Sequence, residues 1–297
     1  MSVEQILQKG VNLMKEFKSG KNRIIYDIGN GQFVIVFRNT ISVGKSVFPK
    51  QIPRKGEISN RMSEFWFDQT QNDFPNHMIS TDNSLMPKLF QEKKYSGRCM
   101  LGKKTQLLPV KCVVYGYLTG NAWEEYRNNN CIVNGKEFFP GIEESEEIGT
   151  IYMPKVTLVD GTEEDMTYEQ TVEFIGEEYA QKLKSLSIEL YKKCARYAKK
   201  KGIIIADTQF RFGIDEDGKL VLASEMITSD SSRFWAVEDY FEGRAQKSLD
   251  KQYLIDWLKG TGWKDGLIIP LIPERVACQT AANIISVYEK LTGKDFY

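Results

Sequence analysis

The sequence contains a single histidine, His77, among its 297 residues. Imidazole-based catalysis needs a nucleophile or a carboxylate beside the ring, and a metal centre needs several ligands. No cysteine or acidic cluster accompanies His77 in the sequence. We therefore expect a structural or surface role for His77, and Ser–His and Cys–His hydrolase mechanisms are disfavoured.

Cysteine is also scarce, and its spacing carries no pattern. A disulfide framework needs an even set of cysteines, and a structural zinc site needs closely spaced pairs such as Cys-x-x-Cys. The sequence therefore supports neither kind of site. The five cysteines are Cys99, Cys112, Cys131, Cys194 and Cys278.

The chain has no net charge and no long apolar run. Forty basic residues balance forty acidic ones, which gives no electrostatic reason to expect nucleic acid or an anionic membrane as a partner. No apolar run reaches the length of about 18 residues that spans a bilayer. The first residues, MSVEQILQKG, lack the apolar core of a signal peptide. We expect a cytoplasmic protein whose partner is a small molecule.

Polar and charged residues gather in one stretch, residues 202–235. The apolar residues 203–205 predict a buried strand that ends at Asp207, and the segment 215–218 predicts a hairpin turn. Glu225 and the run 230–233, Asp-Ser-Ser-Arg, follow the hairpin. Such residues supply metal-type and anion-type ligands to one pocket. The alternative is a surface hairpin with a polar turn.

The remaining pattern predicts an α+β fold with two lobes. A β-rich lobe over residues 1–110 is expected to precede a more helical, mixed lobe over 111–297, with a cleft near 108–116. Residues 128–166 read as a long, loop-rich region. The other expected elements are helices over 2–18, 56–66, 167–201, 251–259 and 274–291, a hairpin over 22–39 that turns at 29–31, and a strand over 107–114.

Several motifs across nearly the whole chain resemble those of the SAICAR synthetase family, the phosphoribosylaminoimidazole-succinocarboxamide synthetases. Together they are far more specific than any single glycine-rich loop. The motifs are Gly20-Lys21-x-Arg23-x-x-Tyr26, Ile52-Pro53-x-Lys55-Gly56, Gly116-Tyr117-Leu118-Thr119-Gly120, Ala206-Asp207-Thr208, Thr228-x-Asp230-Ser231-Ser232-Arg233-Phe234-Trp235 and Asp250-Lys251-Gln252.

The resemblance implies a kinase-like, two-lobed fold with ATP between the lobes. It also implies a carboxylate–amine ligase in purine biosynthesis, in which ATP activates a carboxylate as an acyl phosphate and the amine of aspartate then attacks it. Mg²⁺ would neutralise the phosphates. From the positions that align with the family's site residues, whether or not the residue itself is the same, we predict catalytic roles for Asp207, Glu225 and Arg211, nucleotide binding by Lys21, Arg23, Leu108, Val110 and Lys111, and substrate binding by Lys45, Lys55, Tyr115, Asn121, Gln209, Asp230, Ser231, Ser232 and Arg233.

Some polar positions depart from the family pattern. After Asp207-Thr208 the family has a substrate-binding lysine and a magnesium-binding glutamate, where this chain has Gln209 and Arg211. The second magnesium ligand of the pattern is Ser224 here. A guanidinium cannot ligate a cation, so Mg²⁺ is doubtful and Glu225 is the single candidate ligand. Further departures fall at Lys45, Lys111, Tyr115 and Asn121.

These departures lead to three interpretations. The first is a diverged family enzyme with altered Mg-ATP and substrate residues, which acts on a phosphorylated or carboxylated small molecule in the interlobe cleft. The first alternative is a genuine SAICAR synthetase, which joins aspartate to phosphoribosyl carboxyaminoimidazole with ATP. The second alternative is a non-catalytic, ligand-binding homologue. A homo-oligomer is compatible with each interpretation.

Overall fold

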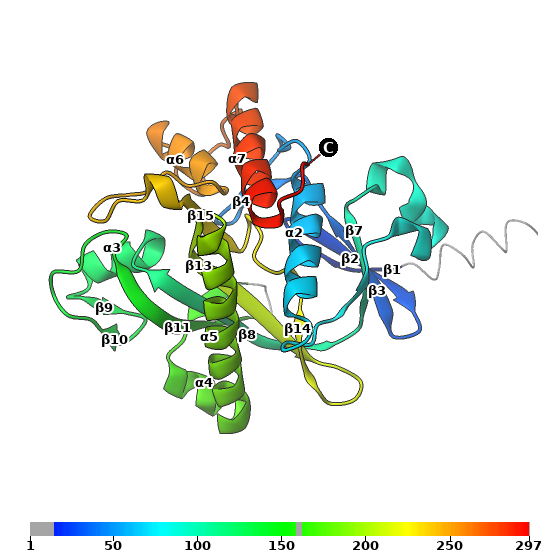
Figure 1. Cartoon of the computed structure of the whole chain (residues 1–297), viewed down its shortest axis with the longest axis horizontal. Coiled ribbons are helices and arrows are strands. Elements are labelled where there is room, and N and C mark those ends of the chain that lie inside the picture. Colours follow the sequence, from blue (N-terminus) through cyan, green and yellow to red (C-terminus); the bar gives the residue numbers. More distant parts are fainter. Residues whose placement is uncertain (1–14, 159–161, 297) are drawn as a thin grey trace, which may run out of the picture.

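A computed structural model describes residues 15–158 and 162–296. It shows the α+β architecture that the sequence predicts, with two principal β-sheets and helices packed around them (Figure 1). The first sheet has five antiparallel strands in the order β1-β2-β3-β7-β6. They are β1 (Lys15–Ser19), β2 (Arg23–Gly29), β3 (Gln32–Phe37), β6 (Met78–Ser80) and β7 (Cys99–Lys103).

The hairpin between β2 and β3 is confirmed. Asn30 and Gly31 have φ angles of 51° and 68°, the left-handed conformation that a tight hairpin turn needs and that an Asn-Gly step adopts readily. By contrast, the helix expected over residues 2–18 is wrong where it can be compared. Residues 1–14 lie outside the described part, and Lys15–Ser19 pair with β2 as strand β1. Strand pairing overrides the local helical spacing there.

Helix α2 (Lys55–Thr70) follows the basic loop, as expected. Its start lies against the end of β3, where Gly56 leaves no space for a side chain. A Cβ atom at Gly56 would lie 2.5 Å from the carbonyl oxygen of Phe37. The close approach fixes Lys55, which is fully buried, at the entrance to the region between the sheets.

The second sheet has six strands in the order β12-β11-β8-β13-β14, with β15 also paired to β13. The strand β11 corrects the expectation of a loop-rich region over 128–166. Its pattern is interrupted by Gly149 and Pro154, but β8 provides a long partner that holds it in the sheet. The strands are β8 (Gln106–Tyr117), β11 (Glu147–Thr157), β12 (Glu163–Asp165), β13 (Ile203–Ile214), β14 (Leu220–Ala223) and β15 (Ser232–Ala236).

The side chains of strand β13 point alternately into the core and to the opposite face of this sheet. Side chains alternate along a strand, so Phe210 and Phe212 enter the core whereas Gln209 and Arg211 point to the other side. We call that other side the cleft face. The predicted division after residue 110 falls within β8, and it stays a prediction.

The helix expected over 167–201 is two helices, α4 (Tyr168–Ile175) and α5 (Glu177–Lys200). A capping box formed by Thr167 and Gln170 begins α4. The break occurs at Gly176, whose φ of 84° is incompatible with a continuous helix. Helix α5 then packs along the core side of the second sheet (Figure 1).

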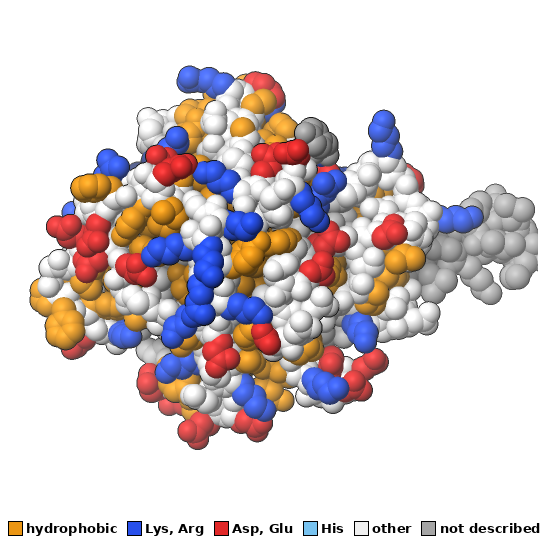
Figure 2. All heavy atoms as spheres, in the orientation of Figure 1, with side chains coloured by type: hydrophobic (Ala, Val, Ile, Leu, Met, Phe, Trp, Pro, Cys, Tyr) orange, Lys and Arg blue, Asp and Glu red, His pale blue; other side chains and the backbone are white. Residues whose placement is uncertain are grey.

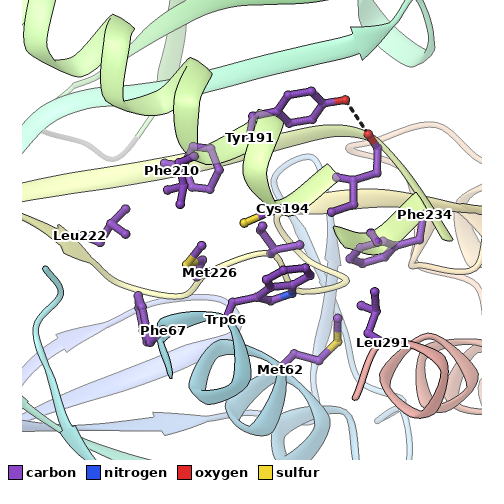
Figure 3. Packing of buried hydrophobic residues seen from close by; sticks show 14 of the residues in the cluster. Met62, Trp66, Phe67, Tyr191, Cys194, Phe210, Leu222, Met226, Phe234 and Leu291 are labelled. Atoms are coloured by element: carbon purple, nitrogen blue, oxygen red, sulfur yellow. Dashed lines mark hydrogen bonds between the residues drawn. The ribbon is translucent and has the colours of Figure 1, made fainter. Parts of the chain in front are cut away.

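The main core lies between α2, α5 and the second sheet. Figure 3 shows Trp66 of α2 close to Cys194 of α5, with Met62 on the other side of Trp66 and Phe210 of β13 beyond Cys194. The hydroxyl of Tyr191 donates a hydrogen bond of 2.7 Å to the carbonyl of Ile205, which ties α5 to β13.

A smaller cluster joins distant parts of the chain. The two-stranded sheet of β4 (Ile41–Val43) and β5 (Ser46–Phe48) packs with α6 (Gln252–Gly260) and α7 (Glu274–Thr292), the two C-terminal helices that the sequence predicts. The short elements α3 (Gly120–Asn128), β9 (Ile132–Val133) and β10 (Lys136–Glu137) lie beside β11. No helix in the described part is long and apolar enough to cross a membrane.

Candidate active site

Two cavities adjoin the cleft face of the second sheet. The first cavity has a volume of about 240 Å³ and is lined by both sheets. Its apolar wall comes from Ile25, Phe33, Ile35 and Leu107, a surface suited to a planar, apolar ligand group. Its cations are Arg23, Lys104 and Arg211.

His77 supports the wall of the first cavity from within the protein. Its ring is buried between Phe33 and Phe67, and Nε2–H donates to the carbonyl oxygen of Ser224 at 2.9 Å. Burial lowers the pKa of His77 to about 4, so the ring is neutral near pH 7. Ser224 has a φ of 79°, a conformation that non-glycine residues rarely adopt.

Glu225 follows Ser224 and is already engaged on both oxygens. Oε1 forms an ion pair of 3.3 Å with Arg23, and Oε2 accepts a hydrogen bond of 3.0 Å from the hydroxyl of Thr228. The two predicted residues Arg23 and Glu225 are therefore brought together. Glu225 acts as the counter-ion of Arg23 in this arrangement.

The second cavity is larger, about 530 Å³, and its wall is mostly polar. It lies over β8 and β13, between α3, α6 and the loop before β15. The structure brings nine of the predicted site residues to it. They are Lys111, Tyr115, Asn121, Asp207, Gln209, Asp230, Ser231, Ser232 and Arg233.

Arg233 and Asp207 form a partly buried ion pair at the wall of the second cavity. Burial raises the pKa of Asp207, while the charges of Arg233 and Lys251 oppose that rise. Gly120 leaves room for the guanidinium, because a Cβ there would lie 2.5 Å from Nη2 of Arg233. Its φ of 59° is also a conformation that favours glycine. Asp250 stands nearby, and burial raises its pKa to about 6.

Asp230 joins the loop before β15 to helix α2. Its Oδ2 accepts from the buried ammonium of Lys55, and its backbone carbonyl accepts from Lys251 at 3.2 Å. Its Oδ1 is buried and has no hydrogen-bond partner among the described residues. A buried acceptor of this kind is costly to leave unpaired, and a ligand N–H or O–H would satisfy it.

The wall between the cavities consists of Lys111, Arg211 and Glu163. Arg211 lines the first cavity, whereas Lys111 and Glu163 line the second. Glu163 forms ion pairs with both cations, at 3.0 Å to Nη2 of Arg211. Arg211 also donates to the hydroxyl of Thr157 at 3.0 Å.

Four predicted residues lie elsewhere. Lys21 is exposed and donates to the carbonyl of Gly44 at 2.6 Å, and the backbone N–H of Lys45 donates to Asp265. Val110 is buried in the main core and Leu108 packs against that core. Both predicted nucleotide contacts therefore lie on the core face of β8 and not on the cleft face. Leu107, which alternates with them, lines the first cavity.

The sequence reasoning also missed residues that line the cavities. Glu163 belongs to a short acidic run, residues 163–165, whose composition is typical of a solvated surface, and only strand pairing across β12, β11, β8 and β13 brings it to Arg211. Lys104 and Lys251 were not proposed as ligand contacts. Lys251 lies inside the Asp250-Lys251-Gln252 motif, and this motif is the feature of the sequence that indicates it.

The carboxylates of the site do not fit a protein-held divalent cation. No group of three or more His, Cys, Asp or Glu side chains suited to a metal occurs within residues 15–158 and 162–296. Mg²⁺ prefers several oxygen ligands in octahedral geometry. Asp207, Glu163, Glu225 and Asp230 are instead paired with cations.

Comparison with known proteins identifies the family. The family model described as SAICAR synthetase matches residues 16–269. The chain belongs to the SAICAR synthetase family. The family resemblance predicted from the motifs is thereby confirmed.

Relatives within the family match this chain almost end to end. A phosphoribosylaminoimidazole-succinocarboxamide synthase of Lachnospira eligens is 42% identical over 286 residues, covering 93% of this chain and 95% of the relative. One of Desulforapulum autotrophicum is also 42% identical, covering 95% and 96%. The solved SAICAR synthase of Saccharomyces cerevisiae in complex with SAICAR has a TM-score of 0.86 and 36% identity, with 96% of each chain covered.

These relatives correct the first functional interpretation. The prediction of a diverged enzyme for another substrate rests on the polar site positions that depart from the family pattern. Similarity of this extent to proteins that carry the synthase name favours the alternative, the SAICAR synthetase itself. The departures at Arg211 and Ser224 remain features of the sequence, but they do not support a change of reaction.

Proposed function

We propose that this protein is a SAICAR synthetase, an ATP-dependent ligase of purine biosynthesis. One observation carries the proposal beyond family membership, namely that two cavities of different character share a wall of charged residues. The first cavity is apolar with cations at its edge, and the second is polar with paired acids and bases. A ligase that activates one substrate with a nucleotide needs two such adjoining sites.

In this proposal the first cavity binds ATP. Ile25, Phe33, Ile35 and Leu107 provide an apolar surface for the base, and Arg23 provides a cation for the phosphates. Because Arg211 forms part of the dividing wall, the terminal phosphoryl group would lie against it. A guanidinium is well suited to hold phosphate oxygens through two hydrogen bonds.

The second cavity then binds phosphoribosyl carboxyaminoimidazole and aspartate. A carboxylate oxygen of the imidazole substrate attacks the γ-phosphorus of ATP, the bond to the β–γ bridging oxygen breaks, and ADP leaves with that electron pair. The aspartate amine next attacks the acyl carbon. The C–N bond forms, the C–O bond to phosphate breaks, phosphate leaves, and the nitrogen loses a proton.

The residues of the second cavity have chemistry that suits these substrates. Ser231, Ser232 and Arg233 offer hydroxyls and a guanidinium to a phosphate or carboxylate. The unpaired Oδ1 of Asp230 would accept from a substrate N–H. Tyr115, Asn121 and Gln209 complete the polar wall. No step is assigned to Mg²⁺, because the carboxylates present do not fit it.

Purified protein tests the proposal directly. Incubation with ATP, aspartate and the carboxyaminoimidazole ribotide should release ADP and phosphate and give the succinocarboxamide product by mass spectrometry. Omission of any one substrate should abolish the product. A folded protein that forms no product with all three would contradict the proposal. Cytoplasmic location and homo-oligomerisation stay predictions.

A further inference from the structure

Three cations face one another in a row across the cleft face of the second sheet. Arg211 of β13 lies directly opposite Lys111 of β8, and Lys111 lies directly opposite Lys155 of β11. Directly opposed residues of antiparallel strands point to the same face of a sheet. Like charges in that position destabilise a sheet, so the row is unfavourable for folding alone.

The row is only partly neutralised by its own strand neighbours. Glu163 is shared between Lys111 and Arg211, and Asp165 pairs with Lys155 at 2.7 Å. Both acids come from the short edge strand β12. The side chain of Glu163 is 32% exposed, whereas that of Lys111 is 11% exposed, so the counter-ion is the more accessible member of the pair.

The surroundings of the row are strongly positive. Burial lowers the pKa of Lys111 to about 8, Glu163 counteracts this, and the charges of Arg211 and Lys251 lower it further. Burial likewise lowers the pKa of Arg211, with Glu163 opposing and Arg23 adding to the effect. Three cations that share only two acids, Glu163 and Asp165, form a site for a multiply charged anion.

The row also lies between the two cavities, with a member at each of them. Arg211 faces the first cavity and Lys111 the second. Because Arg211 and Lys111 are directly opposed on neighbouring strands, a group that passes from a ligand in one cavity to a ligand in the other could contact both side chains. The carboxylates of the same region are paired with cations and do not fit a bound metal.

We propose that Arg211 and Lys111, with Lys155 beside them, bind the phosphoryl group passing between the cavities, and that side-chain cations thereby fill the role a protein-held Mg²⁺ would otherwise have. Glu163 is the resident counter-ion with which the phosphate competes. ATP binding is then largely independent of Mg²⁺. The inference rests on the proposed function for placing ATP in the first cavity, but its test is a binding measurement that needs no turnover.

Calorimetric titration of the full chain with ATP, in MgCl₂ and in EDTA, tests this inference. The two affinities should agree within about threefold. Arg211→Gln and Lys111→Gln should each weaken ATP binding about 10- to 100-fold, the range expected for lost hydrogen bonds to a charged group. AMP lacks the outer phosphates, so its affinity should change little in either variant.

Glu163→Gln provides the opposite test, because removal of the competing charge should strengthen ATP binding. Arg196→Gln is the matched control, since Arg196 is exposed on α5 and should leave ATP binding unchanged. Thermal unfolding of each variant identifies any loss of folding, and Glu163→Gln remains informative if Arg211→Gln does not fold.

Specific results would overturn the inference. They are ATP binding that EDTA abolishes, wild-type affinity in both Arg211→Gln and Lys111→Gln, weaker binding in Glu163→Gln, or no ATP binding in either buffer. The expected binding pattern without any succinocarboxamide product would leave this inference standing and contradict the proposed function. Product formation in MgCl₂ but not in EDTA would support the proposed function and contradict this inference.

Discussion

The outer face of α5 and the wall between the two cavities both carry rows of cations. Figure 2 shows the first row as a band of lysine and arginine side chains over α5. These residues are exposed, and their partners are exposed acids, as in the pair of Lys199 with Glu147 at 3.5 Å. In the wall, Lys111 and Arg211 are largely buried and share one acid, Glu163.

The comparison distinguishes exposed charges, which contribute little to stability, from the buried charges that form part of the candidate site. Exposed ion pairs contribute about 0 to 1 kcal/mol, because water solvates each partner almost as well. Buried charges depend on their partners, since an unpaired one leaves a large desolvation cost. The wall keeps like charges side by side despite that cost, as expected for a functional site.

The largest effect should follow from breaking the buried pair of Lys55 and Asp230. Lys55→Ala leaves the Asp230 carboxylate buried without its cation, which should lower the free energy of unfolding by about 3 to 5 kcal/mol. Urea denaturation followed by circular dichroism measures the change. A loss below about 1 kcal/mol would place this pair with the exposed ones.

Lowering the pH should destabilise the protein through His77, which is buried at the wall of the first cavity. Its pKa is about 4 in the folded protein against an ordinary value of 6.5, so the unfolded chain takes up the proton first as pH falls. Stability from this group is complete above pH 6.5 and is lost towards pH 4, by about 3 kcal/mol in all. The free energy of unfolding, measured by denaturation at several pH values across this range, should fall more steeply towards low pH in the wild type than in His77→Gln. Parallel profiles would contradict a buried, neutral His77.

Gly120 tests the space reserved for Arg233. Gly120→Ala combines a positive φ with an overlap on the guanidinium, and we expect a loss of about 1 to 3 kcal/mol in unfolding free energy. Binding of inorganic phosphate or substrate in the second cavity should weaken in parallel. Gly149→Ala is the control, because Gly149 also has a positive φ but has no neighbouring atom within 4 Å of an added Cβ. Equal losses in both variants would show that only backbone strain matters.

The smallest effect should come from the exposed row. Lys193 pairs with Asp73 across two elements, and both side chains are substantially exposed. Lys193→Ala should lower stability by less than about 1 kcal/mol and leave ligand binding unchanged. Salt should remove even this difference, because exposed pairs are screened. A loss similar to that of Lys55→Ala would remove the distinction between the two regions.

Local sequence pattern predicted the elements that are determined by their own residues, without contributions from distant parts of the chain. The Asn30-Gly31 turn, the start of α2 and the buried strand at 203–205 all follow from residue type and spacing, although that strand continues past Asp207 to Ile214. Strand β11 was missed because its pattern is interrupted and its place depends on pairing with β8. The helix break at Gly176 was missed because helical spacing continues on both sides of it.

The candidate site divides in the same way. The residue types of the run at 230–233 indicate a ligand site, and the cleft-facing Gln209 and Arg211 of β13 follow from the family resemblance. Their partners were not predicted, since Lys55 and Asp230 are 175 residues apart, and Glu163 reaches Arg211 only through four paired strands. Such pairings belong to the tertiary structure, which no local pattern specifies.

One assay addresses the central claim, that two cavities joined by a cationic wall carry out the SAICAR synthetase reaction. Product and ADP would be quantified together from ATP, aspartate and the carboxyaminoimidazole ribotide, once in MgCl₂ and once in EDTA. The account predicts succinocarboxamide product and stoichiometric ADP in both buffers. Absence of product in both buffers from a folded protein would contradict it.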